Sequence, residues 1–196
     1  MASASLRYEG STKFGTNNKW GYFPAASIAW EMANMPFLKD HGHIVQSLKP
    51  RVSYGVTGRS GFGSYQSLST YSTRNSYFFN GQWMTGYAPS LNANPGLAWE
   101  KLVSMNIGVD FVLLNGRLRG SIDLFDRQSQ DLLYNYTAPQ PPYIYSSILV
   151  NVGTTQNRGI EVAIDGDIFS TKDFTWTMGA NWSTGNTIMK NLSNNI

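Results

Sequence analysis

The 196-residue chain contains no cysteine, no long apolar run and little charge, and each of these absences narrows its function. Without cysteine it has neither a disulfide framework nor a thiolate metal site. Because no stretch of about 18 consecutive apolar residues occurs, no transmembrane helix is predicted. Only 14% of the residues are charged, and the net charge of +3 is not gathered into a basic cluster. This distribution argues against nucleic acid as a partner.

The chain does contain a strict alternation of apolar and polar residues over 103–113, followed by a tight turn. The alternation predicts a β-strand with one apolar and one polar face. Its apolar positions are Val103, Met105, Ile107, Val109, Phe111 and Leu113. The Asn115-Gly116 dipeptide that follows favours the positive φ angles of a type I′ hairpin turn. Folding the chain back there places Val109 opposite Ile122 and Ile107 opposite Leu124, so both apolar patterns share one face.

Other segments repeat this alternation. Five further strands are predicted, at residues 6–14, 20–33, 48–58, 159–169 and 174–183. With the hairpin they make about seven strands, or eight or nine if parts of the 60–90 region pair. A strand in a soluble sheet usually has about 5–6 residues, whereas a membrane-spanning strand needs about 9–11. The length of the predicted strands therefore favours a membrane β-protein.

The connections between the strands are of two kinds that alternate along the chain. Residues 115–116 and 170–173 form short turns, whereas residues 58–98 and 129–157 form long polar links. The medium link at residues 35–47 lies on the short-turn side and includes a possible helical turn. Outer-membrane barrels likewise have short periplasmic turns and longer extracellular loops.

These patterns predict an all-β fold, a transmembrane antiparallel β-barrel segment. It is a meander of about 7–9 long strands in an incomplete barrel, with long extracellular loops and short periplasmic turns. The expected lipid-facing residues include Val103, Met105, Ile107, Val109, Phe111, Leu118, Ile122 and Leu124. The expected lumenal residues are Arg7, Glu9, Lys49, Arg51, Asp110, Arg119, Asp123, Glu161 and Asp165. The alternative is a soluble β-sandwich, a carbohydrate-binding module.

Four blocks of the sequence resemble one known family. They cover residues 6–32, 48–61, 94–134 and 151–186. The third is the most specific, because it joins the lead-in Asn-Pro-x-Leu-x-Trp-Glu at 94–100 to the strand SIDLFDR at 121–127. Together the blocks resemble the C-terminal half of the barrel in SusC/RagA-type TonB-linked outer-membrane proteins of Bacteroidetes-like bacteria.

The resemblance implies a barrel of about 22 strands closed around a plug. It further implies an outer-membrane importer in a Gram-negative bacterium, energised by TonB and working with a SusD-like surface lipoprotein. The cargo would be a glycan, an oligosaccharide or a peptide, and the sequence does not name it. Residues 1–196 would then be one part of a single barrel domain, without plug, TonB box or terminal strand.

Residues that invite catalytic or metal chemistry are better explained as structural. His41 and His43 lie in a polar turn and have no third ligand in view, so no metal is predicted. Asp123 and Asp126 are three residues apart, which places them on opposite faces of a strand. No nucleophile and base are paired by any motif. We therefore expect neither an enzyme nor a cofactor.

Aromatic residues gather in the first long link. The candidate ligand-binding residues are Tyr65, Tyr71, Tyr77, Trp83 and Tyr87. Flat rings with hydroxyl groups suit a sugar or a peptide, and the competing interpretation is that the rings pack the loops together. Residues 139–147 add two tyrosines from the second long link. Trp20, Tyr22, Trp99 and Trp182 are assigned instead to the aromatic girdle at the membrane interface.

Overall fold

The structure is a computed structural model that describes residues 1–33, 35–39 and 42–192. One four-residue helix, α1 (Pro36–Lys39), accompanies eleven strands. The strands are β1 (Ala2–Gly10), β2 (Trp20–Ala29), β3 (Val45–Arg59), β4 (Tyr71–Phe79), β5 (Gln82–Pro89), β6 (Glu100–Leu113), β7 (Leu118–Gln130), β8 (Leu133–Thr137), β9 (Ser147–Asn151), β10 (Thr154–Ser170) and β11 (Thr175–Asn191).

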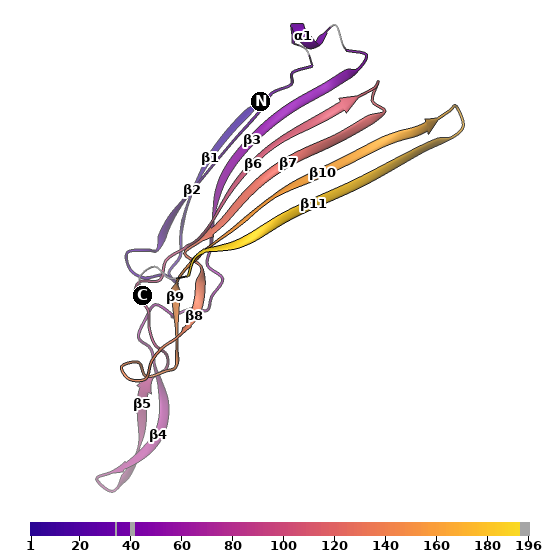
Figure 1. The fold of residues 1–196 in the computed structure, drawn as a ribbon. Coiled ribbons are helices and arrows are strands. Elements are labelled where there is room, and N and C mark those ends of the chain that lie inside the picture. Colours follow the sequence, from indigo (N-terminus) through magenta and orange to yellow (C-terminus); the bar gives the residue numbers. More distant parts are fainter. Residues whose placement is uncertain (34, 40–41, 193–196) are drawn as a thin grey trace.

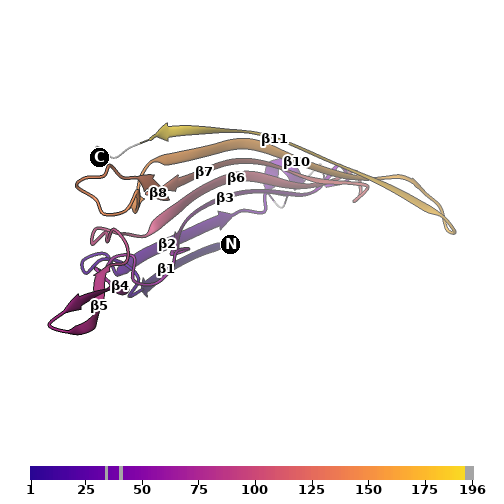
Figure 2. The same cartoon turned by 90° about the horizontal axis from the view of Figure 1, so that it is seen from below.

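Seven of these strands form one antiparallel sheet, in the order β1-β2-β3-β6-β7-β10-β11. Figures 1 and 2 show it as a single curved layer of long strands. The hairpins β4-β5 and β8-β9 form two separate sheets within the two long links. The prediction of about seven strands in a meander is therefore confirmed. Pairing within the 60–90 region also occurs, whereas β8-β9 was not predicted from the sequence.

The β6-β7 hairpin has the predicted register. Val109 pairs with Ile122, and Ile107 pairs with Leu124. Asn115 and Gly116 have φ angles of 57° and 82°, as a type I′ turn requires. The backbone N–H of Arg117 closes the turn by donating to the carbonyl of Leu114 at 3.2 Å.

Several predicted strand boundaries were wrong. The first strand runs over Ala2–Gly10 rather than 6–14, and Phe14 lies in the following loop, where it is almost fully buried. The second ends at Ala29 rather than 33, and β10 begins five residues before the predicted 159. The missed ends are rich in serine, threonine and asparagine, which give no apolar signal. An antiparallel strand with one face toward water needs no apolar side chains on that face.

The two ends of the sheet differ in character. At the short-turn end there are three links: the one that contains α1, residues 114–117, and residues 171–174. At the long-loop end are residues 11–19 and the two links that carry the extra hairpins (Figure 1). The helical turn expected in the medium link is present as α1. The alternation of short and long connections is confirmed.

A carboxylate fastens the first of the short-turn links. Ser47 Oγ donates to Oε2 of Glu31 at 2.6 Å, and the backbone N–H of Leu48 donates to Oε1 at 3.0 Å. The hydrogen bond from Ser47 lowers the pKa of Glu31 from its ordinary value. Glu31 therefore stays charged and bridges the end of β2 to the start of β3.

The buried core lies at the long-loop end of the sheet. Phe14, Phe23, Leu97 and Trp99 form its cluster, here called the loop-base cluster. In the described residues no second sheet packs on the apolar face, where Met105, Ile107, Ile122 and Leu124 are 38–52% exposed. The soluble sandwich is therefore wrong, since its core would lie between two such faces. Within the same residues, no helix is long and apolar enough to cross a membrane.

We predict that the 196-residue chain expressed alone aggregates. In the described sheet β1 and β11 each pair on one side only, and both edges invite further pairing. The wide exposed apolar face adds to this tendency. The measurement is fractionation of cell lysates followed by size-exclusion chromatography and urea unfolding. Recovery of a soluble monomer that unfolds cooperatively without detergent would contradict the prediction.

Candidate functional site

The lead-in motif at residues 94–100 builds the base of the long loops. Asn94 accepts a hydrogen bond from the backbone N–H of Gly96 at 2.9 Å and donates to the carbonyl of Leu149 at 2.9 Å. Leu97 is completely buried, and Trp99 is only 7% exposed. The assignment of Trp99 to the membrane girdle was therefore wrong. Its ring packs against Phe14 at 4.5 Å between centroids, beside the gap that opens where the start of β2 no longer pairs with β3.

Asparagine side chains join the two long loops. Asn92 donates to the carbonyls of Tyr145 at 2.6 Å and Ser147 at 2.9 Å. Asn151 accepts from the backbone N–H of Ala98 at 2.8 Å and donates to its carbonyl at 2.8 Å. The segment before β6 thus lies alongside β9 and satisfies backbone groups that no sheet ladder would pair. Sequence reasoning missed this role, although the repeated asparagines of NANP were its visible signal.

Glu100 completes the loop base. It is 8% exposed, and its carboxylate accepts a hydrogen bond from the backbone N–H of Leu133 at 3.2 Å. Arg59 lies 3.5 Å from the other oxygen. The motif therefore supplies one residue to each of three tasks: Asn94 bonds the loops, Trp99 fills the gap, and Glu100 anchors the start of β8.

The β4-β5 hairpin carries most of the candidate ligand residues. Thr73 pairs with Tyr87, Tyr71 with Pro89, and Phe78 with Trp83. Because paired residues and alternate residues share a face, Tyr71, Trp83 and Tyr87 lie on one side of the hairpin. Their exposed fractions are 67%, 73% and 70%. These three residues, with Phe78, are called the hairpin face below.

The other two candidates lie apart from the hairpin face. Tyr77 pairs with Met84 on the opposite side of the hairpin. Tyr65 lies outside the hairpin, in a turn where its φ is 66°. The structure therefore brings together three of the five predicted residues. In Figure 1 the hairpin extends away from the seven-stranded sheet beyond its long-loop end.

Tyr145 of the second long loop braces the base of this hairpin. Its hydroxyl donates to the carbonyl of Pro89 at 2.7 Å and accepts a hydrogen bond from Arg74. The Arg74 guanidinium lies 5.7 Å from the centre of the Tyr145 ring. One of the two tyrosines predicted for a ligand in this loop is thus engaged in packing.

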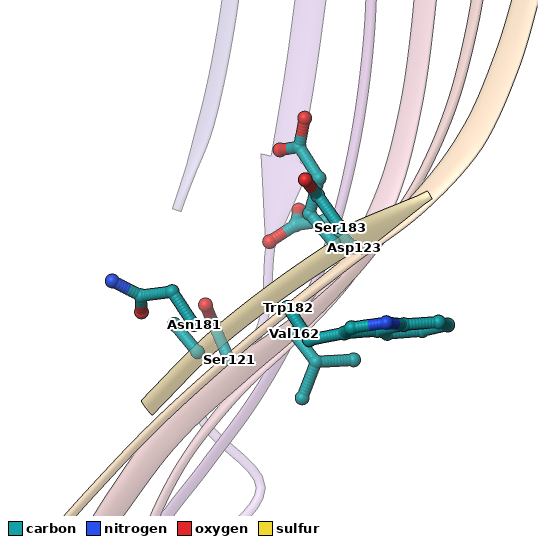
Figure 3. Close-up of a pocket in the computed structure, with 8 residues that line it drawn as sticks. Ser121, Asp123, Val162, Asn181, Trp182 and Ser183 are labelled. Carbon is teal, nitrogen blue, oxygen red and sulfur yellow. The ribbon is translucent and has the colours of Figure 1, made fainter. Parts of the chain in front are cut away.

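The polar face of the sheet carries a shallow hollow of about 320 Å³. Figure 3 shows the side chains of Ser121, Asp123, Asn181 and Ser183 on one side of the strands, with those of Val162 and Trp182 on the other. The register accounts for this separation, because paired residues share a face: Trp182 pairs with Val162, and Ser183 pairs with Glu161. Apolar and polar side chains therefore separate between the two faces as predicted.

A charge network crosses three strands beside this hollow. Arg51, Gly108 and Asp123 occupy one row of the register. The Arg51 guanidinium donates to Asp123 at 2.7 Å and to Asp110 at 3.1 Å. A Cβ atom at Gly108 would lie 2.4 Å from Asp123 Oδ1 and 3.0 Å from Arg51 Cζ. Glycine is needed at this position so that the arginine can reach across β6.

The residues considered for other chemistry behave as structural ones. Asp126 bonds to Gln156 at 2.7 Å and to Arg158 at 2.8 Å, on the face opposite to Asp123. The prediction that the two aspartates face apart is confirmed. His43 lies in an exposed turn, and His41 lies outside the described residues. Over residues 1–33, 35–39 and 42–192 no cluster of three or more metal-ligating side chains occurs.

Comparison with known proteins identifies the family. A family model described as TonB dependent receptor-like, beta-barrel matches residues 1–195. The chain belongs to the TonB-dependent receptors. It forms part of their β-barrel, and the family resides in the outer membrane of Gram-negative bacteria and comprises receptors and transporters, not enzymes.

Individual relatives cover nearly all of the chain. TonB-dependent receptor P39 of Formosa agariphila is 37% identical over 183 residues, which make up 93% of this chain and 17% of that protein. TonB-dependent receptor SusC of Bacteroides thetaiotaomicron is 34% identical over 182 residues, or 90% of this chain and 18% of that protein. The predicted SusC/RagA resemblance is therefore confirmed, and the chain spans less than a fifth of these relatives.

Solved structures share the fold. The RagAB peptide importer in its closed-closed state matches with a TM-score of 0.86 and 26% identity, over 100% of this chain and 21% of that chain. Its open-open state matches with a TM-score of 0.87 over the same shares. The seven-stranded sheet is thus part of a barrel wall, with its apolar face toward lipid and its polar face toward the lumen.

We predict that Gly108→Ala destabilises the full-length barrel by about 1–3 kcal/mol, because the new methyl group overlaps the Arg51–Asp123 pair. The matched control is Gly166→Ala, where the nearest atom to a Cβ is 3.8 Å away. Urea unfolding of both variants in lipid vesicles measures the difference. Equal loss of stability in the two variants would show that the pair does not constrain this position.

We also predict that Asn151→Ala loosens the long loops, because it leaves the backbone groups of Ala98 without partners, at a cost of about 1–3 kcal/mol. A protease added to intact cells should then cleave both loops of the full-length protein faster. Asn135→Ala, at an exposed position of β8, is the control. Identical cleavage rates for the two variants would argue against a joining role.

Proposed function

We propose that the full-length protein containing this chain imports an oligosaccharide or a peptide across the outer membrane. Family membership supports this role, as does the presence of a SusC and a peptide importer among the relatives. TonB would supply the energy through parts of the protein outside this chain. A SusD-like surface lipoprotein would be its partner above the loops.

Within that role, the hairpin face is the part of this chain that meets the substrate. Trp83 and Tyr87 are four residues apart on one strand, which separates their Cα atoms by about 13 Å. Two exposed rings at that spacing can contact successive units of an extended chain, and the flanking Tyr71 adds a hydroxyl. The observation that carries this proposal is that three aromatic side chains share one face and are each more than two-thirds exposed.

The opposite side of the hairpin suits the lipoprotein. Tyr77, Phe79 and Met84 lie there, and they are 43–65% exposed. Apolar side chains on both sides of a two-stranded hairpin favour partners on both sides, because a lone hairpin cannot bury either face itself. The hairpin would then lie between the substrate and the lipoprotein.

We predict that Trp83→Ala and Tyr87→Ala each weaken uptake about two- to tenfold without abolishing it, because one aromatic contact contributes modestly. Growth on the cognate nutrient is compared at equal surface levels of the full-length transporter. The matched control is Tyr134→Ala, which removes a similarly exposed tyrosine of β8 outside the hairpin and should leave uptake unchanged.

Deletion of residues 61–87 tests the loop as a whole. It removes both faces of the hairpin and should reduce uptake far more than either single substitution. Uptake that is unchanged after this deletion would show that the rings only pack the loop. In that case the hairpin face would be withdrawn as a ligand site.

A further inference from the structure

The apolar band on the outward face of the sheet has a slanted upper edge. Its uninterrupted apolar run ends toward the long loops at Val56 on β3, at Leu124 on β7 and at Trp182 on β11. In the register this edge descends six residues, about 20 Å, while crossing four strand spacings, about 19 Å. The strands are therefore inclined by about 45° to the membrane normal, which is the tilt of barrel strands in membranes.

The outward residues that directly follow the apolar run mark the edge of the band toward the long loops. These are Lys101 on β6, Asp126 on β7 and Arg158 on β10. Asp126 forms an ion pair with Arg158 at 2.8 Å. Lys101 is exposed, and its side chain has no ion-pair or hydrogen-bond partner among the residues that the structure describes. An unpaired cation thus stands where the lipid headgroups begin.

A hollow of about 230 Å³ lies beside this lysine. It lies where the β2–β3 ladder ends at the Ala25–Gly55 pair, so that residues 20–24 at the start of β2 stand apart from β3. Phe23 and Trp99 fill the floor of the gap, with ring centroids 5.3 Å apart. The residues that border the hollow include Asn17, Asn18, Trp20, Tyr22, Lys101 and Asp131.

We propose that this hollow binds the phosphate-bearing headgroup of an outer-leaflet lipid. Lys101 would donate to the phosphate, and an asparagine amide of the preceding loop would donate beside it. The rings of Trp20 and Tyr22 are 61% and 63% exposed and would cover the headgroup at the interface. The hollow is continuous with the lipid-facing surface, because Trp20 and Tyr22 alternate with lumenal residues along β2.

The same hollow holds one group that opposes an anion. Asp131 borders it, and a carboxylate close to a phosphate raises the energy of the bound state. Binding should therefore respond in opposite directions to the loss of the lysine charge and of the aspartate charge. Non-specific adhesion of lipid to an apolar surface has no such pattern.

The test measures lipid binding to the full-length transporter in detergent by native mass spectrometry. The probes are phosphatidic acid and diacylglycerol with identical acyl chains, which differ only in the phosphate. We expect phosphatidic acid to bind more tightly, and Lys101→Gln to raise its Kd about fivefold, the effect of one basic residue near an anionic headgroup. Asp131→Asn should lower the same Kd.

Lys49→Gln is the matched control, because Lys49 lies on the lumenal face and its loss should leave the Kd unchanged. If Lys101→Gln cannot be recovered, Lys101→Met replaces it, and the preference of the wild type for phosphatidic acid should fall as salt is added. Equal binding of the two lipids, or a Kd unaffected by loss of Lys101, would overturn the proposal. The measurement does not depend on transport, so its failure would leave the proposed import function standing.

Discussion

The whole structure depends on one constraint: every backbone N–H and C=O of a strand in lipid needs a partner within the protein. A sheet one layer thick meets this requirement through its ladders alone. The described strands accordingly make their substantial contacts with hydrogen-bonded neighbours, and no second layer covers the apolar face of the described sheet. Side chains in the wall are thus released from core packing, and the two faces are free to meet lipid and water.

The core that a soluble protein would place between two sheets is found here where the ladder fails. β2 and β3 part after Ala25–Gly55, and the two long loops leave the sheet at the same end. Backbone groups there have no partner in a strand ladder. Asparagine side chains form the hydrogen bonds instead, and the loop-base cluster supplies the packing. This explains why the most specific stretch of the sequence, residues 94–100, is a structural motif. It closes the wall where strands become loops.

What could be predicted from the sequence follows from the same division. In the wall, alternation and turn chemistry determine the structure locally, so the β6-β7 register was correct to the residue. At the start of β1 the residues are small alanines and serines, so apolar and polar positions hardly differ, and the strand was placed four residues late. Trp99 was misassigned because a tryptophan at a strand end is equally typical of a girdle and of a wedge between strands. The β8-β9 hairpin and the bonds from Asn151 depend on partners remote in the chain, which no local pattern indicates.

The lack of a covering layer also explains the use of glycine within the wall. A side chain on a single sheet can be covered only from the side, by a neighbour that lies over the adjacent strand. Phe111 is paired with Gly120, and Phe125 with Gly159. A Cβ at either glycine would come within 2.6 Å of the facing ring, so each ring lies flat across the gap that its glycine leaves. Phe111 faces lipid and Phe125 faces the lumen, which means that both surfaces use this device. The arginine above Gly108 is its polar counterpart, with a guanidinium in place of a ring. Glycine in this sheet therefore makes room for a side chain from the adjacent strand, whereas in a layered protein that side chain would pack against the opposite sheet.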